Sequence, residues 1–271
     1  MIIVVMVSSC YFCVMNLESG SSIFPLAVLP PISWLAVASL FTHIKLEVKE
    51  TYPKQTIRNH YYIATANGTL KCSIPVTKSN GNKTRTEEVF TGNEPWSRVH
   101  LRAIESAYSN SAYFIHYIDE LRALFPVNQV VSLVDLALRS NQFFVKKFKL
   151  NLEIGTTEDW RPYSESFDLR KFLVIPELTV PISGLSENVE HPPAGIKNDI
   201  VSTFAKSIAD FTHEQITLRY PAYFQNFSEK YGFVGNLSVL DILFNLGPES
   251  RDYIIQLGRQ FDEIITTKLT G

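Results

Sequence analysis

The sequence predicts an α/β fold, with a mixed sheet, a β-α-β-like N-terminal part and a helical middle and C-terminal region. Short apolar runs alternate with a helical pattern near the start. An Asn-Gly turn joins strand-like runs, and amphipathic helical patterns fill residues 95–150 and the C-terminal part. Because the strands expected after Leu152 are short and interrupted, α+β is the alternative.

The N-terminal part predicts a strand, a proline loop, a helix and a second strand. Ile23 to Leu29 is a short apolar run that ends at Pro30-Pro31, and ISWLAVASLF has the apolar density of a helix. Ile44 to Val48 alternates strictly between apolar and polar residues, which is typical of a strand with one wet face.

A β-hairpin follows. HYYIAT and TLKCSIPV flank Ala66-Asn67-Gly68, and an Asn-Gly pair between strand-like runs is a strong hairpin signal. Pro75 donates no ladder hydrogen bond, so we expect the second strand to end there or to lie at an edge. The polar segment KSNGNKTRTEE beyond it predicts a mobile loop.

Helices are expected from residue 95 onward. Asn93 offers an N-cap for the first, in which Trp96, His100, Ile104 and Tyr108 share one ridge. SAYFIHYIDELRALF and VNQVVSLVDLALRSNQFFVKKF predict a second and a third helix.

The C-terminal half begins with extended segments around prolines up to about Val180, followed by a surface helix in IKNDIVSTFAKSIADF. AYFQNFSEKYGF predicts a helix that ends near Gly232, and NLSVLDILFNLGP predicts one that Gly247-Pro248 stops. A last amphipathic helix covers residues 249–269.

Composition excludes several classes of protein. The chain has 271 residues, 45% hydrophobic and 19% charged, which is enough to bury a sizeable core. A formal net charge of -2 gives no overall positive field, so we expect no nucleic-acid partner. Cys10 and Cys13 lack the second pair or the histidine that would complete a zinc set, so we predict no metal site.

The first fourteen residues are apolar, but no positive charge precedes them and no small-residue cleavage site follows. They are also too short to cross a membrane, so we expect no integral membrane segment and a cytoplasmic location. We expect residues 1–14 to be an extension from a mis-assigned start codon, with Met15 opening the protein. Residues 15–271 are then expected to form a single domain.

Polar clusters remain once the common motifs are excluded. No phosphate-loop, dinucleotide, serine-hydrolase or zincin motif occurs, so the reaction and any cofactor stay unknown. Lys54, Arg58 and Asn59 come where a connection enters a strand, which suits donors aimed at a phosphate or a carboxylate. The alternative is a solvated strand mouth in which Arg58 pairs with an acid such as Glu50.

Two further polar positions can be explained by structural roles alone. His100 lies between Trp96 and Ile104 on an apolar ridge, where a core histidine bonded to a carbonyl is the alternative to a functional one. Asp241 follows Ser238 by three residues at the start of an apolar helix, which is the form of a capping box. We therefore expect Asp241 to cap that helix.

Several segments, in order, resemble the WbqC-like protein family in its compact Bacteroidetes-type form: KQTIRN, TANGTLKCSIPV, W-x-x-x-H with SAY and SAYF behind it, and NLSVLDILFNLGP. The resemblance covers about Phe24 to Phe125 and Tyr220 to Ser250, and FDLRKF resembles a further short segment. Family members are associated with O-antigen and other surface-polysaccharide gene clusters, and a glycine or aminoacyl transferase role has been suggested for them.

The resemblance implies a cytoplasmic transferase that moves an acyl or aminoacyl (glycyl) group from an activated donor to an amino sugar. The alternative is a non-catalytic sugar-nucleotide-binding or assembly protein. The ligand is in either case a small molecule, an activated sugar or acyl donor, and the oligomeric state stays open. The matching polar positions are Lys54, Arg58, Asn59, His100, Tyr108, Asn236, Ser238, Asp241 and Asn245.

Within this set the resemblance makes His100 the candidate catalytic base and the other residues candidate substrate-binding groups. Arg58 and Lys54 would hold a phosphate, and Asn59 or Asn236 would donate to an oxyanion. We expect Arg58, His100 and Asn236 to converge on one cleft. The chain departs from the family at KETY, where Glu50 is the only acid, and at SENVEHPPAGIKNDIVSTF, which replaces a stretch of the longer members.

Overall fold

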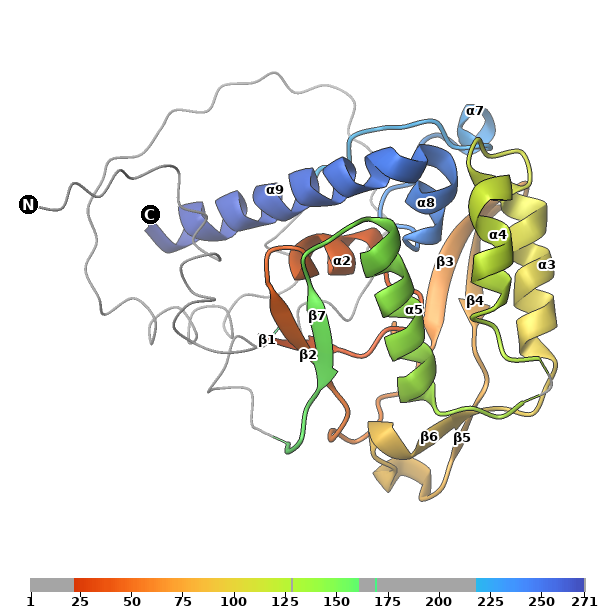
Figure 1. The fold of residues 1–271 in the computed structure, drawn as a ribbon, viewed down its shortest axis with the longest axis vertical. Coiled ribbons are helices and arrows are strands. Elements are labelled where there is room, and N and C mark those ends of the chain that lie inside the picture. Colours follow the sequence, from red (N-terminus) through yellow and green to blue (C-terminus); the bar gives the residue numbers. More distant parts are fainter. Residues whose placement is uncertain (1–21, 128, 161–168, 170–217, 271) are drawn as a thin grey trace, which may run out of the picture.

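The structure is a computed structural model that describes residues 22–127, 129–160, 169 and 218–270 (Figure 1). Its N-terminal part is the expected β-α-β unit: strand β1 (Ser22–Pro25), helix α2 (Ile32–Ala38) and strand β2 (His43–Glu47). Strand β7 (Glu153–Thr156) joins the other side of β2, and the three strands form a parallel sheet in the order β1-β2-β7. The α/β class is confirmed. The expected single mixed sheet is not, because among the described residues the antiparallel pairs β3-β4 and β5-β6 form separate sheets.

The predicted hairpin is also present. Strand β3 (His60–Thr65) pairs antiparallel with β4 (Gly68–Ser73), with Tyr61 opposite Cys72 and Thr65 opposite Gly68. Gly68 has φ +96°, a conformation that suits glycine in a tight turn. Strand β4 ends before Pro75, as expected.

The segment predicted as a mobile loop is instead part of a small structured unit. Strand β5 (Val76–Lys78) pairs with β6 (Val89–Thr91), and the 3-10 turns η1 (Gly81–Lys83) and η2 (Thr86–Glu88) lie between them. The reason is that its threonines face inward, with Thr84 1% and Thr86 0% exposed. Their backbones bond to the connection between β2 and β3, through Tyr52 N to Thr84 O and Thr86 N to Glu50 O.

The three middle helices are α3 (Trp96–Tyr108), α4 (Phe114–Arg122) and α5 (Leu133–Lys147). The ridge expected on α3 is confirmed, since Trp96, His100, Ile104 and Tyr108 are all buried. Pro95 rather than Asn93 occupies the N-cap of α3, so that detail of the prediction was wrong. Figure 1 shows α3 beside the β3–β4 hairpin. Helix α4 is tied to α3 through the bond from Arg122 to Glu105.

The C-terminal part contains α7 (Ser228–Tyr231), α8 (Leu240–Leu246), the 3-10 turn η4 (Gly247–Glu249) and the long α9 (Ser250–Thr270). The helix expected around Gly232 is thus only one turn. Gln225 turns its side chain inward, where its amide bonds both the N–H and the carbonyl of Val234. This exchange holds residues 222–227 out of a helix.

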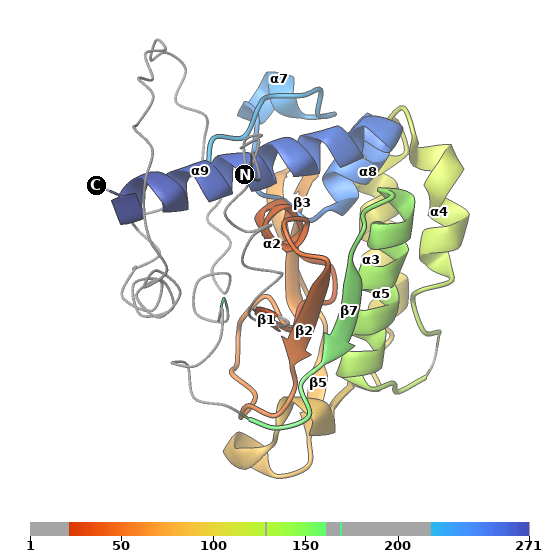
Figure 2. The same cartoon turned by 60° about the vertical axis from the view of Figure 1, so that its left-hand side comes forward.

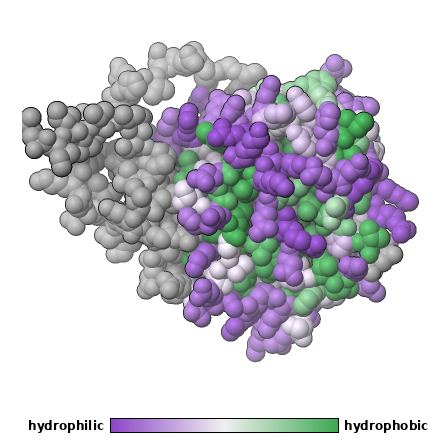
Figure 3. Space-filling view, in the orientation of Figure 1, coloured by the Kyte–Doolittle hydropathy of each residue, from purple (hydrophilic) through white to green (hydrophobic). Residues whose placement is uncertain are grey.

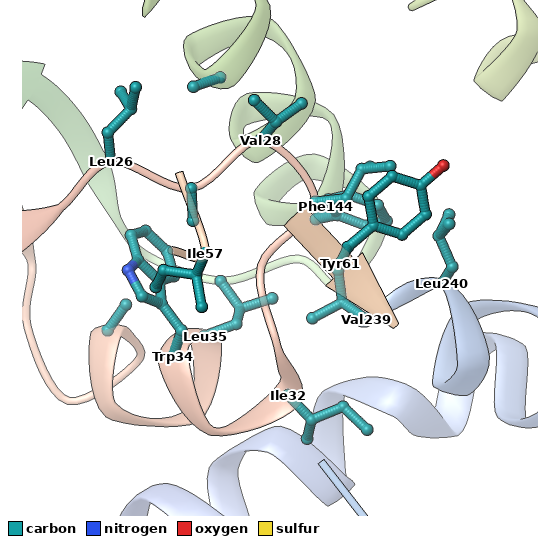
Figure 4. Close-up of a cluster of buried hydrophobic side chains, with 14 of the residues drawn as sticks. Leu26, Val28, Ile32, Trp34, Leu35, Ile57, Tyr61, Phe144, Val239 and Leu240 are labelled. Carbon is teal, nitrogen blue, oxygen red and sulfur yellow. The ribbon is translucent and has the colours of Figure 1, made fainter. Parts of the chain in front are cut away.

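The core lies between the parallel sheet, α2, α5, α8 and the hairpin. The Trp34 ring packs edge-to-face on Phe24 with centroids 5.2 Å apart, and its Nε1–H donates to the Pro25 carbonyl. In Figure 4, Trp34, Leu35 and Ile57 lie in this cluster, and the hydroxyl of Tyr61 points away from it. Figure 3 shows apolar side chains interspersed with hydrophilic ones on the outer face.

Several predictions fall outside the described residues, namely the extension 1–14, the extended segments of FLVIPELTVPI (172–182) and the surface helix 196–211. The single-domain assignment of residues 15–271 stays a prediction. Among the described helices, none combines the length and the apolar character that a bilayer crossing needs.

Candidate functional site

Four residues come together where the parallel sheet ends, and we name them the basic cluster: Tyr52, Lys54, Arg58 and Lys78. The first three belong to the connection that follows the carboxyl end of β2, and Lys78 is the last residue of β5. Figure 2 shows the carboxyl ends of β2 and β7 directed toward the β5–β6 unit. Open α/β sheets commonly bind ligands at this edge.

Arg58 is the buried anchor of the cluster, with 2% of its surface exposed. Its Nε donates to Glu50 at 2.8 Å and its Nη1 to Thr56 at 3.2 Å, and Nη2 also donates to Glu50. This is the Glu50 pairing that the sequence left open as the alternative. Because a guanidinium carries further N–H groups, direct ligand contact by Arg58 stays a prediction.

Lys78 and Tyr52 have buried polar atoms without a hydrogen-bond partner in the described part of the chain. The Lys78 ammonium lies 4.7 Å from the centroid of the Tyr52 ring, a cation–π contact. The Tyr52 side chain is 4% exposed, so water does not freely solvate its hydroxyl. The Lys78 ammonium and the Tyr52 hydroxyl are therefore neighbouring hydrogen-bond donors from which no described residue accepts.

Electrostatics in the cluster favour the binding of an anion. Burial raises the pKa of Tyr52 to about 12, although the charge of Arg58 opposes this, so the phenol keeps its proton and acts as a donor. Burial and then the nearby charge of Lys54 lower the pKa of Lys78. The second effect means that Lys54 and Lys78 lie close enough to repel each other.

Lys54 itself is exposed and precedes Gln55, which has φ +58°. A residue with a side chain adopts this left-handed conformation only at some cost, and such positions cluster at functional sites. Sequence reasoning found Lys54 but missed Tyr52 and Lys78. Lys78 begins the segment that was expected to be a loop, and the long-range bonds from Thr84 and Thr86 to residues 50 and 52 left no local signal.

Asn59 closes the end of the hairpin. Its Nδ2 donates to the Ile74 carbonyl at 2.8 Å, and its own carbonyl accepts from the Ile74 N–H at 2.8 Å. Its Oδ1 is buried with no partner among the residues described. Asn59 thus has a structural role, and its use as a ligand donor stays a prediction.

His100 has the surroundings of a core histidine. It is 6% exposed, its Nδ1 hydrogen-bonds the Tyr61 hydroxyl at 2.9 Å, and its ring packs edge-to-face on Trp96. Burial lowers its pKa to about 4, and a hydrogen bond with the backbone of Ser73 opposes the shift. The ring is therefore neutral at ordinary pH. This is the alternative interpretation of His100, and a catalytic role stays a prediction.

A second polar group, which we name the Asp241 network, consists of Tyr108, Tyr223, Gln225, Asp241 and Asn245. The Tyr108 hydroxyl donates to Asp241 Oδ1 at 2.9 Å, and Gln225 Nε2 donates to Oδ2 at 2.8 Å. Tyr223 also donates to Oδ2, and Asn245 Nδ2 donates to the Asp241 carbonyl. Tyr108, Asp241 and Asn245 were among the candidate site residues. Gln225 was missed, because it lies in an irregular segment without a motif.

Asp241 does not form the predicted capping box. The N-cap residue of α8 is Val239, which makes no side-chain bond, and Ser238 Oγ accepts instead from the Leu240 N–H at 3.4 Å. The Asp241 carboxylate is completely buried among the donors of its network. Burial raises its pKa, while the hydrogen bonds from Tyr223, Gln225, Tyr108 and Asn245 oppose the shift. The local pattern was overridden because tertiary donors reach the carboxylate.

Asn236 and Ser238 join the C-terminal part to the first elements. Asn236 Oδ1 accepts from the Ser33 N–H at 2.9 Å and so caps α2, whose own N-cap, Pro31, makes no side-chain bond. The Ser238 N–H donates to the Tyr62 carbonyl of β3 at 2.9 Å. Both contacts hold the fold together. The convergence of Arg58, His100 and Asn236 on one cleft stays a prediction.

The model of the WbqC-like protein family matches residues 44–253. The chain belongs to the WbqC-like protein family. All of the basic cluster, His100 and the Asp241 network lie inside the matched region of this WbqC-like chain.

A relative is the uncharacterized protein Rv1507c of Mycobacterium tuberculosis (strain ATCC 25618 / H37Rv). It is 23% identical over 212 residues, which are 75% of this chain and 83% of that protein. No solved structure matches the chain.

Proposed function

We propose that this WbqC-like protein acts in the cytoplasm in the assembly of a surface polysaccharide such as O-antigen, where it binds an activated, anionic sugar or acyl donor at the basic cluster. One observation carries the proposal: the Lys78 ammonium and the Tyr52 hydroxyl are buried beside Lys54 with no partner in the described structure. Unused buried donors cost free energy, and an anion that accepts their hydrogen bonds removes that cost.

The reaction we propose is transfer of an acyl or aminoacyl group to the amine of a sugar. Such a transfer needs a neutral amine and a base that takes its proton as it attacks. A neutral His100 has the protonation state of a base, but the Tyr61 hydroxyl already occupies Nδ1. An acceptor amine would have to displace that hydroxyl or reach the ring by another path.

A non-catalytic sugar-nucleotide-binding protein is the second candidate, and the engagement of His100 by both Tyr61 and Ser73 favours it. The two functions share the basic cluster and differ only in whether a bound donor is turned over.

Mass spectrometry of small molecules retained on protein purified from its native host tests the proposal. We expect a phosphorylated or otherwise anionic sugar or acyl donor, and incubation with amino-sugar nucleotides should then consume it. Retention of a neutral compound alone would contradict the proposal. Saturable binding without turnover for any donor would leave the binding function and remove the transferase.

The His100→Gln variant separates the roles of His100. Loss of turnover by about 10²–10⁴-fold with an unchanged melting temperature would support the base. A lower melting temperature with unchanged turnover per folded molecule would make His100 purely structural.

A further inference from the structure

We infer that the basic cluster is a binding site for a phosphoryl dianion, contacted by Lys54, Lys78 and Tyr52, with Arg58 as a positioning residue. The inference deepens the proposed function and rests on it only for the molecule that carries the phosphate. The site lies at the carboxyl end of the parallel sheet, between residues 50–58 and β5.

Two hydrogen-bond donors of the basic cluster have no acceptor among the described residues. An ammonium and a phenol offer donors, and those of Lys78 and Tyr52 find no acceptor within the described ranges. The great majority of buried polar side chains in proteins are paired, so two neighbouring unpaired donors call for a partner that the described residues do not supply. Phosphoryl oxygens are strong acceptors and can serve several donors at once.

The net charge of the basic cluster favours a dianion. The cluster has three cations, Lys54, Arg58 and Lys78, and Glu50, which both Nε and Nη2 of Arg58 contact. The neighbouring acids are engaged elsewhere, since Glu47 accepts from Thr157 and Glu87 pairs with Lys49. A monoanionic carboxylate would leave one of the lysine charges uncompensated, whereas a phosphoryl dianion matches both.

The loop that carries Lys54 is also held in position. Arg58 ties this loop together by bonding Glu50 on one side and Thr56 on the other. Gln55 holds a left-handed conformation between them, directly after Lys54. The structure thus fixes the position of an exposed lysine, which a purely solvating residue would not need.

Isothermal titration of the full chain with inorganic phosphate, pyrophosphate and acetate at constant ionic strength tests the site. The variants are Lys78→Met and Tyr52→Phe, with Lys146→Met as the matched control. Lys146 is exposed in the last turn of α5. It lies at the end of α5 opposite to Ser132, and Ser132 is the residue that forms a β-bridge with Phe90 of β6. Thermal melts establish that each variant is folded.

We expect phosphate and pyrophosphate to bind wild type and Lys146→Met equally. Loss of Lys78 should weaken binding by on the order of tenfold or more, and loss of the Tyr52 hydroxyl by roughly threefold to tenfold. Acetate should bind far more weakly than phosphate.

Three results would overturn the inference. Equal binding of acetate and phosphate would show that the site does not prefer a dianion. The proposed function would remain, because an acyl donor can carry a carboxylate. Unchanged phosphate binding in both folded variants would place the anion elsewhere. Absence of phosphate and pyrophosphate binding would remove the site. Conversely, phosphate binding at this site without any donor turnover would remove the proposed transferase and keep the inference.

Discussion

The basic cluster and the Asp241 network are both buried polar groups assembled from distant segments, yet they differ in how their hydrogen bonds are satisfied. Both carboxylate oxygens of Asp241 accept bonds from tyrosine or glutamine side chains. In the described part of the chain, the Lys78 ammonium and the Tyr52 hydroxyl have no acceptor. The Asp241 carboxylate is thus satisfied by described side chains, although the Oδ1 of Asn245 in the same network is buried without a partner among the described residues. The two donors of the basic cluster are not satisfied within that part of the chain.

This difference in pairing distinguishes a polar group that holds the fold together from one that can bind a ligand. A buried polar group that is paired within the chain stabilises one arrangement of its elements, as Asp241 does for α3, α8 and residues 223–225. A buried polar group without a partner lowers stability and calls for a specific explanation, of which completion by a ligand is one. Both groups have residues inside the matched family region, so family resemblance alone did not distinguish them.

The largest expected effect is in the network. Asp241→Ala should lower the free energy of unfolding by about 4 kcal/mol, because it strands the donors of Tyr108, Tyr223 and Gln225 in the interior. Urea unfolding measures this. Asp119→Ala, at a side chain 85% exposed, is the control and should change little. A near-wild-type midpoint for Asp241→Ala would show that the network is not a scaffold.

The anchor of the basic cluster comes next. Arg58→Ala should destabilise the fold by about 3 kcal/mol, because Glu50 loses its guanidinium partner inside the protein. Phosphate binding should weaken as well, through the loop that carries Lys54. Arg58→Lys, which keeps the charge but not the two-pronged geometry, should recover part of both losses. Wild-type stability with only weakened binding would make Arg58 a direct ligand.

The pH dependence of stability tests the core position of His100. Its pKa falls from about 6.5 when unfolded to about 4 when folded, so between these values the unfolded chain binds a proton that the folded chain does not. Stability is therefore retained above pH 6.5 and lost as pH falls, by about 2 kcal/mol at pH 5.

Urea unfolding of wild type and His100→Gln across this pH range isolates the effect. The comparison is needed because burial and Lys71 also lower the pKa of His60. An equal slope in both proteins would mean that His100 is accessible to protons in the folded state.

The smallest effects are expected from the same substitution, tyrosine to phenylalanine, made in the Asp241 network and in the basic cluster. Tyr108→Phe removes a hydroxyl that donates to Asp241 and should cost about 1–2 kcal/mol. Tyr52→Phe removes a hydroxyl without an acceptor in the described structure and should leave stability unchanged or raise it slightly. If Tyr52→Phe were as costly as Tyr108→Phe in the absence of ligand, the contrast between the two regions would fail.

Local patterns predicted much of the fold. The parallel β-α-β unit, the hairpin at Asn67-Gly68 and the buried ridge of α3 all follow from periodicity and turn chemistry, which act over a few residues. The polar loop after Pro75 and the helix before Gly232 were misjudged. Inward-facing Thr86 and Gln225 decide their structure through contacts far along the chain.

The candidate site was predicted in part for the same reason. Lys54 and Arg58 were visible as a basic pair before a strand. Lys78 joins them because the turns between β5 and β6 bond to residues 50 and 52 through Thr86 and Thr84, and its ammonium lies over the Tyr52 ring. The Ser238 and Asp241 spacing suggested a cap, and tertiary donors took the carboxylate instead. Spacing along the chain points to candidate polar residues. The fold decides which of their hydrogen-bonding groups are paired.

The most direct test is urea unfolding of wild type and Lys78→Met, each with and without phosphate at constant ionic strength. Without phosphate, the variant should be at least as stable as wild type, because methionine removes an ammonium that is buried with no hydrogen-bond acceptor among the residues described. With phosphate, wild type should gain more stability than the variant, by about 1.4 kcal/mol at saturation for a tenfold loss of affinity, so that the variant loses its advantage. A variant that is less stable without phosphate and gains as much as wild type from it would contradict the account.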